Sequence, residues 1–278
     1  TPYTSGFRKA LKITNGNQTS GAGAADYIKF TTKLEAQDIA SSGWNYVSSS
    51  SNITLSYWVR SSVAQTFFVP VTAMDSPVYN FPFSYAVSAN TWTKVTKTIP
   101  GNSNLVFNND NGTGLDIEWT LFRGTDTTGS GATLDTWAAY DSSQRQPDNT
   151  STWYTTNDAT FLITGVQLEV GGQVTPFEHT TKSEELNECF RYYRLQSKTR
   201  QSGREGGASN YVMLNSFPLS PHMRNTPTVA MYGSANYNSN VSSIGTVNIA
   251  QDHVGFTGSI SDGNYWYYNN GWTADAEL

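Results

Sequence analysis

Runs of alternating apolar and polar residues constrain this chain most, because a period of two fits an extended strand with one buried face. The clearest run is Asn52–Arg60, where Ile53, Leu55, Tyr57 and Val59 alternate with their neighbours. Similar runs recur along the chain and are separated by segments rich in Gly, Pro, Asn and Ser. Strands connected in this way pair antiparallel, so the sequence predicts an all-β protein.

The first part of the chain holds enough of these runs for a complete sandwich. The predicted strands are 10–14, 27–32, 52–60, 65–73, 81–87, 92–99, 115–121 and 161–170. About eight short antiparallel strands with no parallel crossover pattern are typical of a jelly-roll β-sandwich. A helical turn is predicted at 34–39, and Gly165 within the last strand indicates a bulge. The segment 124–160 is predicted to be one long loop.

The segment after the last of these strands divides the chain. Residues 181–184 read Thr-Lys-Ser-Glu and fit a capping box at the start of a short helix. Leu186, Cys189, Phe190 and Tyr193 recur at helical spacing, which predicts an apolar face that buries Cys189, the single cysteine. The predicted division is a jelly-roll domain at 1–175, a connector with this short helix at 176–196 and a smaller β domain at 197–278.

The last part of the chain is also predicted to be all-β. A polar loop is expected at 197–210, followed by strands at 211–217, 228–233, 241–249, 253–260 and 265–269. Its apolar content is thin for an independent domain, so we expect it to dock on the jelly roll or on a neighbouring chain.

Composition excludes several classes of partner. The net charge is −5 with no basic stripe to neutralise phosphates, which argues against nucleic acid. No apolar run is long enough to span a bilayer, so membrane insertion is not predicted. The chain begins at Thr1 without Met, which suggests a processed product or a part of something longer.

The sequence offers no catalytic set, so we predict that the protein is not an enzyme. Its three histidines, His179, His222 and His253, are scattered and form no metal-binding pair. Asp116 and Glu118 share one strand face at a separation of about 7 Å, a spacing that glycoside hydrolysis can use. A solvated strand face explains this pair more simply.

No cofactor is predicted, and the evidence for a metal is weak. The run Asn108–Asn111 forms an oxygen-rich turn that a structural calcium ion could use. Because only Asp110 in this run is a carboxylate, a turn that bonds its own backbone is the favoured interpretation.

Aromatic residues among polar ones are the better signal for binding, because sugar C–H faces stack on aromatic rings while sugar hydroxyls need polar partners. Two places combine both, the long loop and the C-terminal run YWYYNNGW. Core packing or a subunit interface is the alternative at each. The candidate ligand-binding residues are Trp137, Tyr140, Trp153, Tyr154, Trp266, Tyr268 and Trp272.

One long segment carries a family resemblance. Residues 159–194 read ATFLITGVQLEVGGQVTPFEHTTKSEELNECFRYYR, which resembles a segment of bacteriophage virion and tail-fibre proteins: a GVQLE strand, a PFE turn and a short helix ending in RYY. The resemblance continues through LSYWVRSS (55–62), FPFSYAVSANTWTKVTKTIPG (81–101), NGTGLDIEWTLFRG (111–124) and the terminal WTADAEL (272–278). It implies a jelly-roll module similar to carbohydrate-binding modules. It assigns no catalytic or binding residue.

From this resemblance we expect a virion protein, located on the tail or capsid surface of an extracellular phage particle. The expected role is a tail fibre or receptor-binding fibre that presents a β-rich head to host cell-surface polysaccharide. The expected partners are other virion proteins and other copies of the chain in a homotrimer. Two alternatives stay open: a capsid decoration or fibre-anchoring protein, and a carbohydrate-binding module of a secreted polysaccharide hydrolase.

Overall fold

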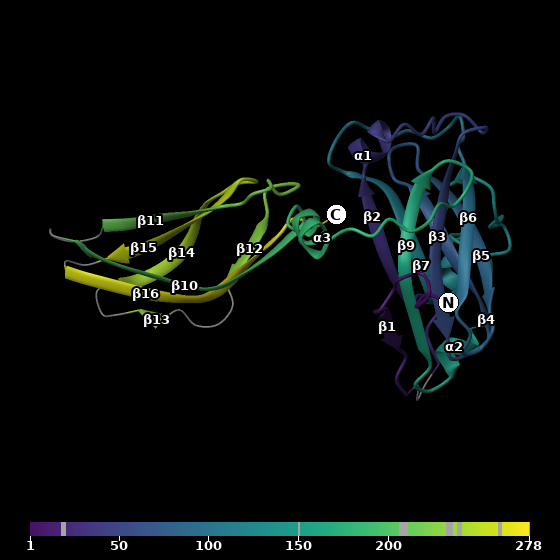
Figure 1. Ribbon diagram of the computed structural model, residues 1–278, viewed down its shortest axis with the longest axis horizontal. Helices are drawn as coiled ribbons and strands as arrows, with labels where there is room; N and C mark the ends of the chain where they lie inside the picture. The colour runs from purple at the N-terminus through teal and green to yellow at the C-terminus, as the bar shows by residue number, and fades with distance from the viewer. Residues whose placement is uncertain are drawn as a thin grey trace. The chain divides into compact units, whose positions relative to one another are not determined.

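The computed structural model describes residues 1–17, 21–149, 151–205, 211–231, 236–237, 241–260 and 263–277. They form two compact units, Thr1–Glu178 and His179–Leu278 (Figure 1). The boundary between the units lies inside the segment 176–196, where the sequence predicts the connector.

The first unit is a sandwich of two antiparallel sheets (Figure 1). One sheet has the order β1 (Leu11–Thr14), β9 (Thr160–Val170), β3 (Asn52–Ser61), β6 (Thr93–Pro100). The other has the order β2 (Tyr27–Glu35), β7 (Thr113–Arg123), β4 (Gln65–Ala73), β5 (Tyr79–Val87), with the short β8 (Ala138–Ala139) at its edge. Apart from β8 and the β4–β5 hairpin, successive strands alternate between the two sheets, and the two strand orders are those of a jelly roll, which confirms the predicted fold.

The core lies between the inner faces of these two sheets, as the period-two pattern predicts. Ile53, Leu55, Tyr57 and Val59 of β3 are all buried, and so are their counterparts on the other sheet. Trp119 of β7 stacks on a ring from β2 and lies edge-on to Tyr57. Full burial of a side chain of this size contributes about 1.5–3 kcal/mol, so the inner faces hold the two sheets together.

The predicted bulge at Gly165 is present in β9. The β3–β9 register shifts between Ser56 and Trp58. Gly165 has φ of 62°, and the ring of Phe7 fills the space that a Cβ would need. Glycine is therefore required here both by backbone conformation and by packing.

The predicted long loop contains small elements of its own. A 3-10 turn η1 (Thr125–Thr127), the strand β8 and the one-turn helix α2 (Thr152–Thr155) lie within it. The helical turn predicted at 34–39 is α1 (Ala36–Ser41). Because β8 pairs with β5, the loop is attached to the edge of the five-stranded sheet.

The second unit begins with the helix α3 (Lys182–Cys189) and then holds two small antiparallel sheets. One sheet contains β10 (Tyr193–Glu205), β16 (Gly263–Asp275) and β12 (Thr228–Met231), with β13 (Asn236–Tyr237) also paired to β16. The other contains β11 (Tyr211–Pro218), β15 (His253–Ile260) and β14 (Val241–Ile249). A small core gathers around Phe256 and Trp272.

Three sequence predictions about this unit are wrong. Cys189 is exposed, and α3 has no buried residue, with Leu186 at 47% exposure, so the apolar spacing on this helix does not mark a buried face. The polar segment predicted as a loop from Ser197 is mostly the strand β10, because its backbone pairs along the length of β16.

No helix in the described ranges is long and apolar enough to cross a bilayer.

Candidate functional site

The outer face of the five-stranded sheet carries a buried polar cluster. Strand alternation that sends Ile117 and Trp119 of β7 into the core sends Asp116 and Glu118 to the opposite face. Asp116 is 9% exposed and Glu118 is 3% exposed. The interpretation of these carboxylates as a solvated strand face is therefore wrong, because the long loop and neighbouring side chains cover them.

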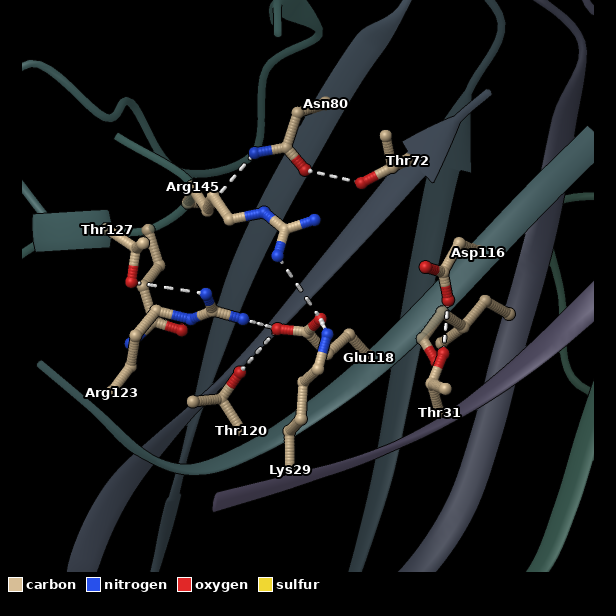
Figure 2. Close-up of polar contacts among 12 residues, drawn as sticks. Lys29, Thr31, Thr72, Asn80, Asp116, Glu118, Thr120, Arg123, Thr127 and Arg145 are labelled. Atoms are coloured by element: carbon tan, nitrogen blue, oxygen red, sulfur yellow. Dashed lines mark hydrogen bonds and ion pairs between the residues drawn. The ribbon is translucent and has the colours of Figure 1, made fainter. Parts of the chain in front are cut away.

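Glu118 is the centre of this cluster, which we define as Glu118 with Lys29, Arg123 and Arg145 (Figure 2). Lys29 and Arg123 form direct ion pairs with its carboxylate, and a guanidinium nitrogen of Arg145 lies 3.7 Å from it. The hydroxyl of Thr120 also donates to it at 3.3 Å. Three cations thus surround one carboxylate.

The arrangement lowers the pKa of two of the cations. Burial lowers the pKa of Arg123 to about 10, and repulsion from Arg145 adds to the effect. Burial also lowers the pKa of Lys29, with repulsion from Arg145 and then Arg123 contributing. Burial thus disfavours the charged forms of Lys29 and Arg123, and the nearby positive charges add to this effect.

Several donors of the cluster are unused. The guanidinium of Arg145 makes no hydrogen bond, and its Nε is buried without a partner. The Nε of Arg123 is likewise buried without a hydrogen-bond partner. Buried donors are nearly always paired in folded proteins, so unused donors on two adjacent guanidinium groups are unusual.

Side-chain hydrogen bonds fasten the long loop over this face. The amide of Asn80 on β5 donates to the backbone carbonyl of Arg145 at 2.8 Å and accepts from Thr72 at 3.2 Å (Figure 2). Arg123 donates to the hydroxyl of Thr127 at 3.2 Å. The loop therefore brings Arg145 to the sheet through contacts that do not involve the Arg145 side chain.

A pocket of about 200 Å³ lies where the loop meets β5 and β8. Asn80 lies in its wall, so one side chain borders the pocket and holds the backbone of Arg145. Hydrogen bonds from Ser143 lower the pKa of Asp141, which is therefore ionised at neutral pH. The pocket is lined by Asn80, Pro82, Gly131, Ala132, Thr133, Ala138, Ala139, Asp141 and Gln144.

Three of the predicted ligand-binding aromatics are buried. Trp137 is 6% exposed, packs on Phe81 and donates its indole N–H to the carbonyl of Pro100 at 2.7 Å. Trp153 is fully buried in the same core, and Trp272 is 2% exposed in the core of the second unit. These three rings pack in hydrophobic cores, and their predicted role in ligand binding stays a prediction.

The other four candidate ligand-binding residues are Tyr140, Tyr154, Trp266 and Tyr268. Tyr140 is half-buried between Ala139 and Asp141 of the chain, and the guanidinium of Arg145 lies 5.3 Å from its ring centre. Tyr154 is half-buried and stacks on Phe122 with the ring centres 4.3 Å apart. The side chains of Trp266 and Tyr268 lie outside the described residues. Tyr140 is therefore the one predicted residue that the described structure brings to the cluster.

The Asn-rich turn at Asn108–Asn111 contains a bond from the backbone to a side chain of the turn, as the favoured interpretation predicts. Asp110 accepts from the backbone N–H of Gly112 at 2.9 Å, and Asn108 bonds to Asp75. Within the described residues, no group of three or more His, Cys, Asp or Glu side chains is arranged to hold a metal ion.

Sequence reasoning does not single out Lys29, Arg123 or Arg145. Lys29 and Glu118 fall on the polar faces of predicted strands, so a correct pairing of β2 with β7 would bring them together. Arg145 carries no local signal, because it lies in an irregular loop and reaches the cluster only through the tertiary fold.

Comparisons with known proteins find structural similarity at low TM-scores. No family model and no curated protein matches the chain. Among solved structures, it is similar to one described as "CBM4 structure and function", with 12% identity, a TM-score of 0.30 and coverage of 53% of this chain and 64% of that one. A second, "Family 16 Carbohydrate Binding Module-2", has 11% identity, a TM-score of 0.29 and coverage of 59% and 77%. The chain thus spans less than two thirds of the first structure, and the jelly-roll assignment rests on strand order.

Proposed function

We propose that the first unit is a non-enzymatic glycan-binding domain that recognises saccharide on the outer face of its five-stranded sheet. The observation that carries this proposal is the pocket between the loop and β5. Two of its lining residues, Asp141 and Gln144, are chain neighbours of Tyr140 and Arg145, whose ring and guanidinium pair at 5.3 Å. An aromatic ring, amide and carboxylate groups and a rigid sheet are the elements that a sugar site requires.

The state of Glu118 supports a binding role over hydrolysis. A glycosidase needs one carboxyl group that can donate a proton to the leaving oxygen. Direct ion pairs with Lys29 and Arg123 favour the ionised form of Glu118 and occupy both of its oxygens. The carboxylate of Asp116 accepts a hydrogen bond from the hydroxyl of Thr31, so Asp116 and Glu118 do not form a pair of free carboxyl groups.

We further propose that the chain is a phage virion protein, in a tail fibre or receptor-binding fibre that presents this domain to host polysaccharide. The sequence segments that resemble phage fibre proteins support this, and a homotrimer would follow from the same resemblance. A single sugar site of this kind binds weakly, and three copies on one fibre would raise the affinity through avidity.

A structural role is the second candidate. The burial of Trp137, Trp153 and Trp272 favours it, because aromatic residues that fill cores need no ligand to account for them. Under this alternative the chain is a decoration or fibre-anchoring protein whose partners are other virion proteins.

A glycan array probed with the whole chain tests the proposal. We expect binding to at least one saccharide, and we expect Ala139→Trp, which fills the pocket, to weaken that binding at least about tenfold. Ala89→Trp places the same ring at an exposed position away from the pocket lining and should leave binding unchanged. Absence of binding to any saccharide, or equal binding by parent and Ala139→Trp, would overturn the proposal and favour the structural role.

A further inference from the structure

The charges on the outer face of the five-stranded sheet do not balance. Lys29, Arg123 and Arg145 share the single carboxylate of Glu118, which leaves an excess of two positive charges. Asp116 offsets part of this excess, because its carboxylate attracts the charge of Lys29, and the three cations still outnumber the two carboxylates. Thr31 also donates to the carboxylate of Asp116. Three cations on one carboxylate repel one another, and this repulsion contributes to the lowered pKa of Lys29.

The excess of positive charge is accompanied by hydrogen-bond donors that have no acceptor. Arginine carries five N–H donors and lysine three. Arg145 uses none of its side-chain donors, Arg123 leaves its Nε unused, and Lys29 makes one bond, to Glu118. The Nε atoms of Arg123 and Arg145 are buried, while the other donors of Lys29 and Arg145 are partly exposed. An anion that accepts from these exposed donors would form charge-assisted hydrogen bonds.

Access to these donors is graded. The side chain of Arg123 is 1% exposed, whereas those of Lys29 and Arg145 are 23% and 20% exposed. An incoming anion would therefore meet Lys29 and Arg145 first, with the charge of Arg123 beneath them. Figure 2 shows the three cationic groups gathered around the carboxylate of Glu118.

Tyrosine rings accompany both accessible cations. The Nζ of Lys29 lies 5.2 Å from the ring centre of Tyr27, and the guanidinium of Arg145 lies 5.3 Å from that of Tyr140. Tyr27 is 57% exposed. Rings beside cations supply surfaces for the C–H faces of a sugar next to the groups that would hold its charge.

We propose that this face selects acidic saccharides, with a carboxylate or sulfate group of the sugar bound by Lys29 and Arg145 and the ring held against Tyr27 or Tyr140. This rests on the proposed glycan-binding function and names its ligand class. Asp141 in the pocket is ionised and accepts a hydrogen bond from Ser143, so the pocket would repel the acidic group of the saccharide. The neutral part of the saccharide would therefore extend over the pocket, while its acidic group stays at the cluster.

Titration calorimetry with charge-matched polymers tests the inference. The probes are polygalacturonate and its fully methyl-esterified form, together with a sulfated galactan and the corresponding neutral galactan. We expect the whole chain to bind at least one acidic polymer about tenfold or more tightly than its neutral counterpart, and to lose affinity as salt is raised. The two acidic probes distinguish carboxylate from sulfate.

Charge-removing variants locate the effect. Arg145→Gln and Lys29→Gln should each reduce acidic binding to near the neutral level, and Arg145→Lys should keep part of the preference. Lys12→Gln removes the same charge from an exposed position on β1, in the other sheet, and should change nothing. Thermal unfolding of each variant verifies that it is folded, and Arg145 is a favourable position because its tie to Asn80 is through the backbone.

The outcomes separate this inference from the function on which it rests. Equal binding of acidic and neutral polymers, unchanged in Arg145→Gln, would overturn the acidic preference and leave glycan binding standing. Binding to none of the polymers and to no saccharide on an array would overturn both. Acidic preference that persists in both Arg145→Gln and Lys29→Gln would also overturn the inference, because the charge would then be held elsewhere.

Discussion

Glu118 is a residue whose removal should be costly out of proportion to its size. It is 3% exposed and is the shared carboxylate of Lys29, Arg123 and Arg145. Replacing one partner of a buried ion pair leaves the other charge uncompensated, which typically costs about 3–5 kcal/mol. We therefore expect Glu118→Gln to lower the free energy of unfolding of the first unit by about that amount.

Chemical denaturation of the two proteins measures this effect. Glu178→Gln, at an exposed position of the same unit, is the matched control and should stay within about 0.5 kcal/mol of the parent. A Glu118→Gln protein as stable as this control would mean that the cations do not depend on the carboxylate.

Gly165 gives a second prediction at the scale of one residue. Its φ of 62° is costly for an L-residue with a side chain, and the ring of Phe7 occupies the space a Cβ would need. Gly165→Ala should therefore destabilise the first unit by at least about 1–2 kcal/mol, measured by thermal or urea unfolding. Gly21→Ala, where nothing lies within 4 Å of an added Cβ, should be near neutral, and equal losses in the two variants would contradict this account.

The contrast between these two residues shows what sequence can predict at this scale. A glycine in an alternating strand pattern signals a bulge by itself, because the cause is local backbone geometry. The burial of Glu118 is not local. It depends on Lys29 from a strand paired across the sheet and on Arg145 from a loop of irregular structure, and alternation predicts a face without predicting what covers it.

At the scale of elements, the N-terminus of α3 carries a pH dependence. The backbone N–H of Thr181 donates to Glu184 at 2.8 Å, and the backbone N–H of Glu184 donates to the hydroxyl of Thr181, which completes the predicted capping box. The hydrogen bond from the Thr181 backbone, then that from its side chain, lowers the pKa of Glu184. Because the folded pKa is below its ordinary value, the stabilisation is complete above that value and is lost as pH falls through the folded pKa.

We expect amide hydrogen exchange in the first turn of α3 to accelerate on acidification below the ordinary carboxyl range, beyond the intrinsic pH dependence of exchange. Glu184→Gln should remove this extra dependence, while Glu188→Gln, near the other end of the helix, should keep it. The same pH response in parent and Glu184→Gln would show that the capping carboxylate is not responsible.

Asn80 determines how the long loop is held. It bonds the carbonyl of Arg145 and the hydroxyl of Thr72, and it is 5% exposed. Asn80→Ala leaves both partners unsatisfied, which should cost about 1–3 kcal/mol and release the loop. Limited proteolysis should then cut between residues 124 and 150 faster than in the parent, whereas Asn45→Ala, at an exposed amide, should not change the rate. An unchanged cleavage rate in Asn80→Ala would show that other contacts hold the loop.

Elements were predictable from sequence where they alternate and less so where they do not. β4, β14 and β15 have the predicted bounds, because apolar alternation and flanking turn residues mark them. The part of β10 from Ser197 onward is predicted as a loop, because its Ser, Thr, Arg and Gly residues carry no alternation and the strand forms by pairing with β16. The sequence predicts correctly where α3 begins, but the apolar face it predicts for this helix is not buried.

At the scale of the whole molecule, each unit contains a hydrophobic core of its own among the residues that the structure describes. The first unit has a core shared by both sheets, and the described part of the second includes a cluster around Phe256 and Trp272. We expect a chain of residues 1–178 to fold alone with one cooperative transition and to retain glycan binding, as measured by calorimetry. Failure of this shorter chain to fold would show that the second unit is required for its stability.

The proposed trimer is tested separately. Light scattering of the whole chain should give three times the monomer mass, whereas residues 1–178 should be monomeric, because the thin apolar content of the second unit favours burial against neighbouring copies. A whole chain that stays monomeric at high concentration would contradict the trimer without bearing on the glycan site.

The base of the long loop is closed by backbone contacts, and this has a consequence for variation. Thr128 bridges Gln146, and the N–H of Gly129 donates to the carbonyl of Gln146 at 3.1 Å, so residues 129–144 leave and return at nearly the same point. Lengthening a loop whose ends are already joined costs little, about 0.6 kcal/mol for each doubling. Different sequences grafted in place of residues 130–144 would therefore give the same sandwich new recognition surfaces. Arg145 would stay in place, because its backbone N–H donates to the carbonyl of Thr127 at 3.1 Å as part of the same anchor.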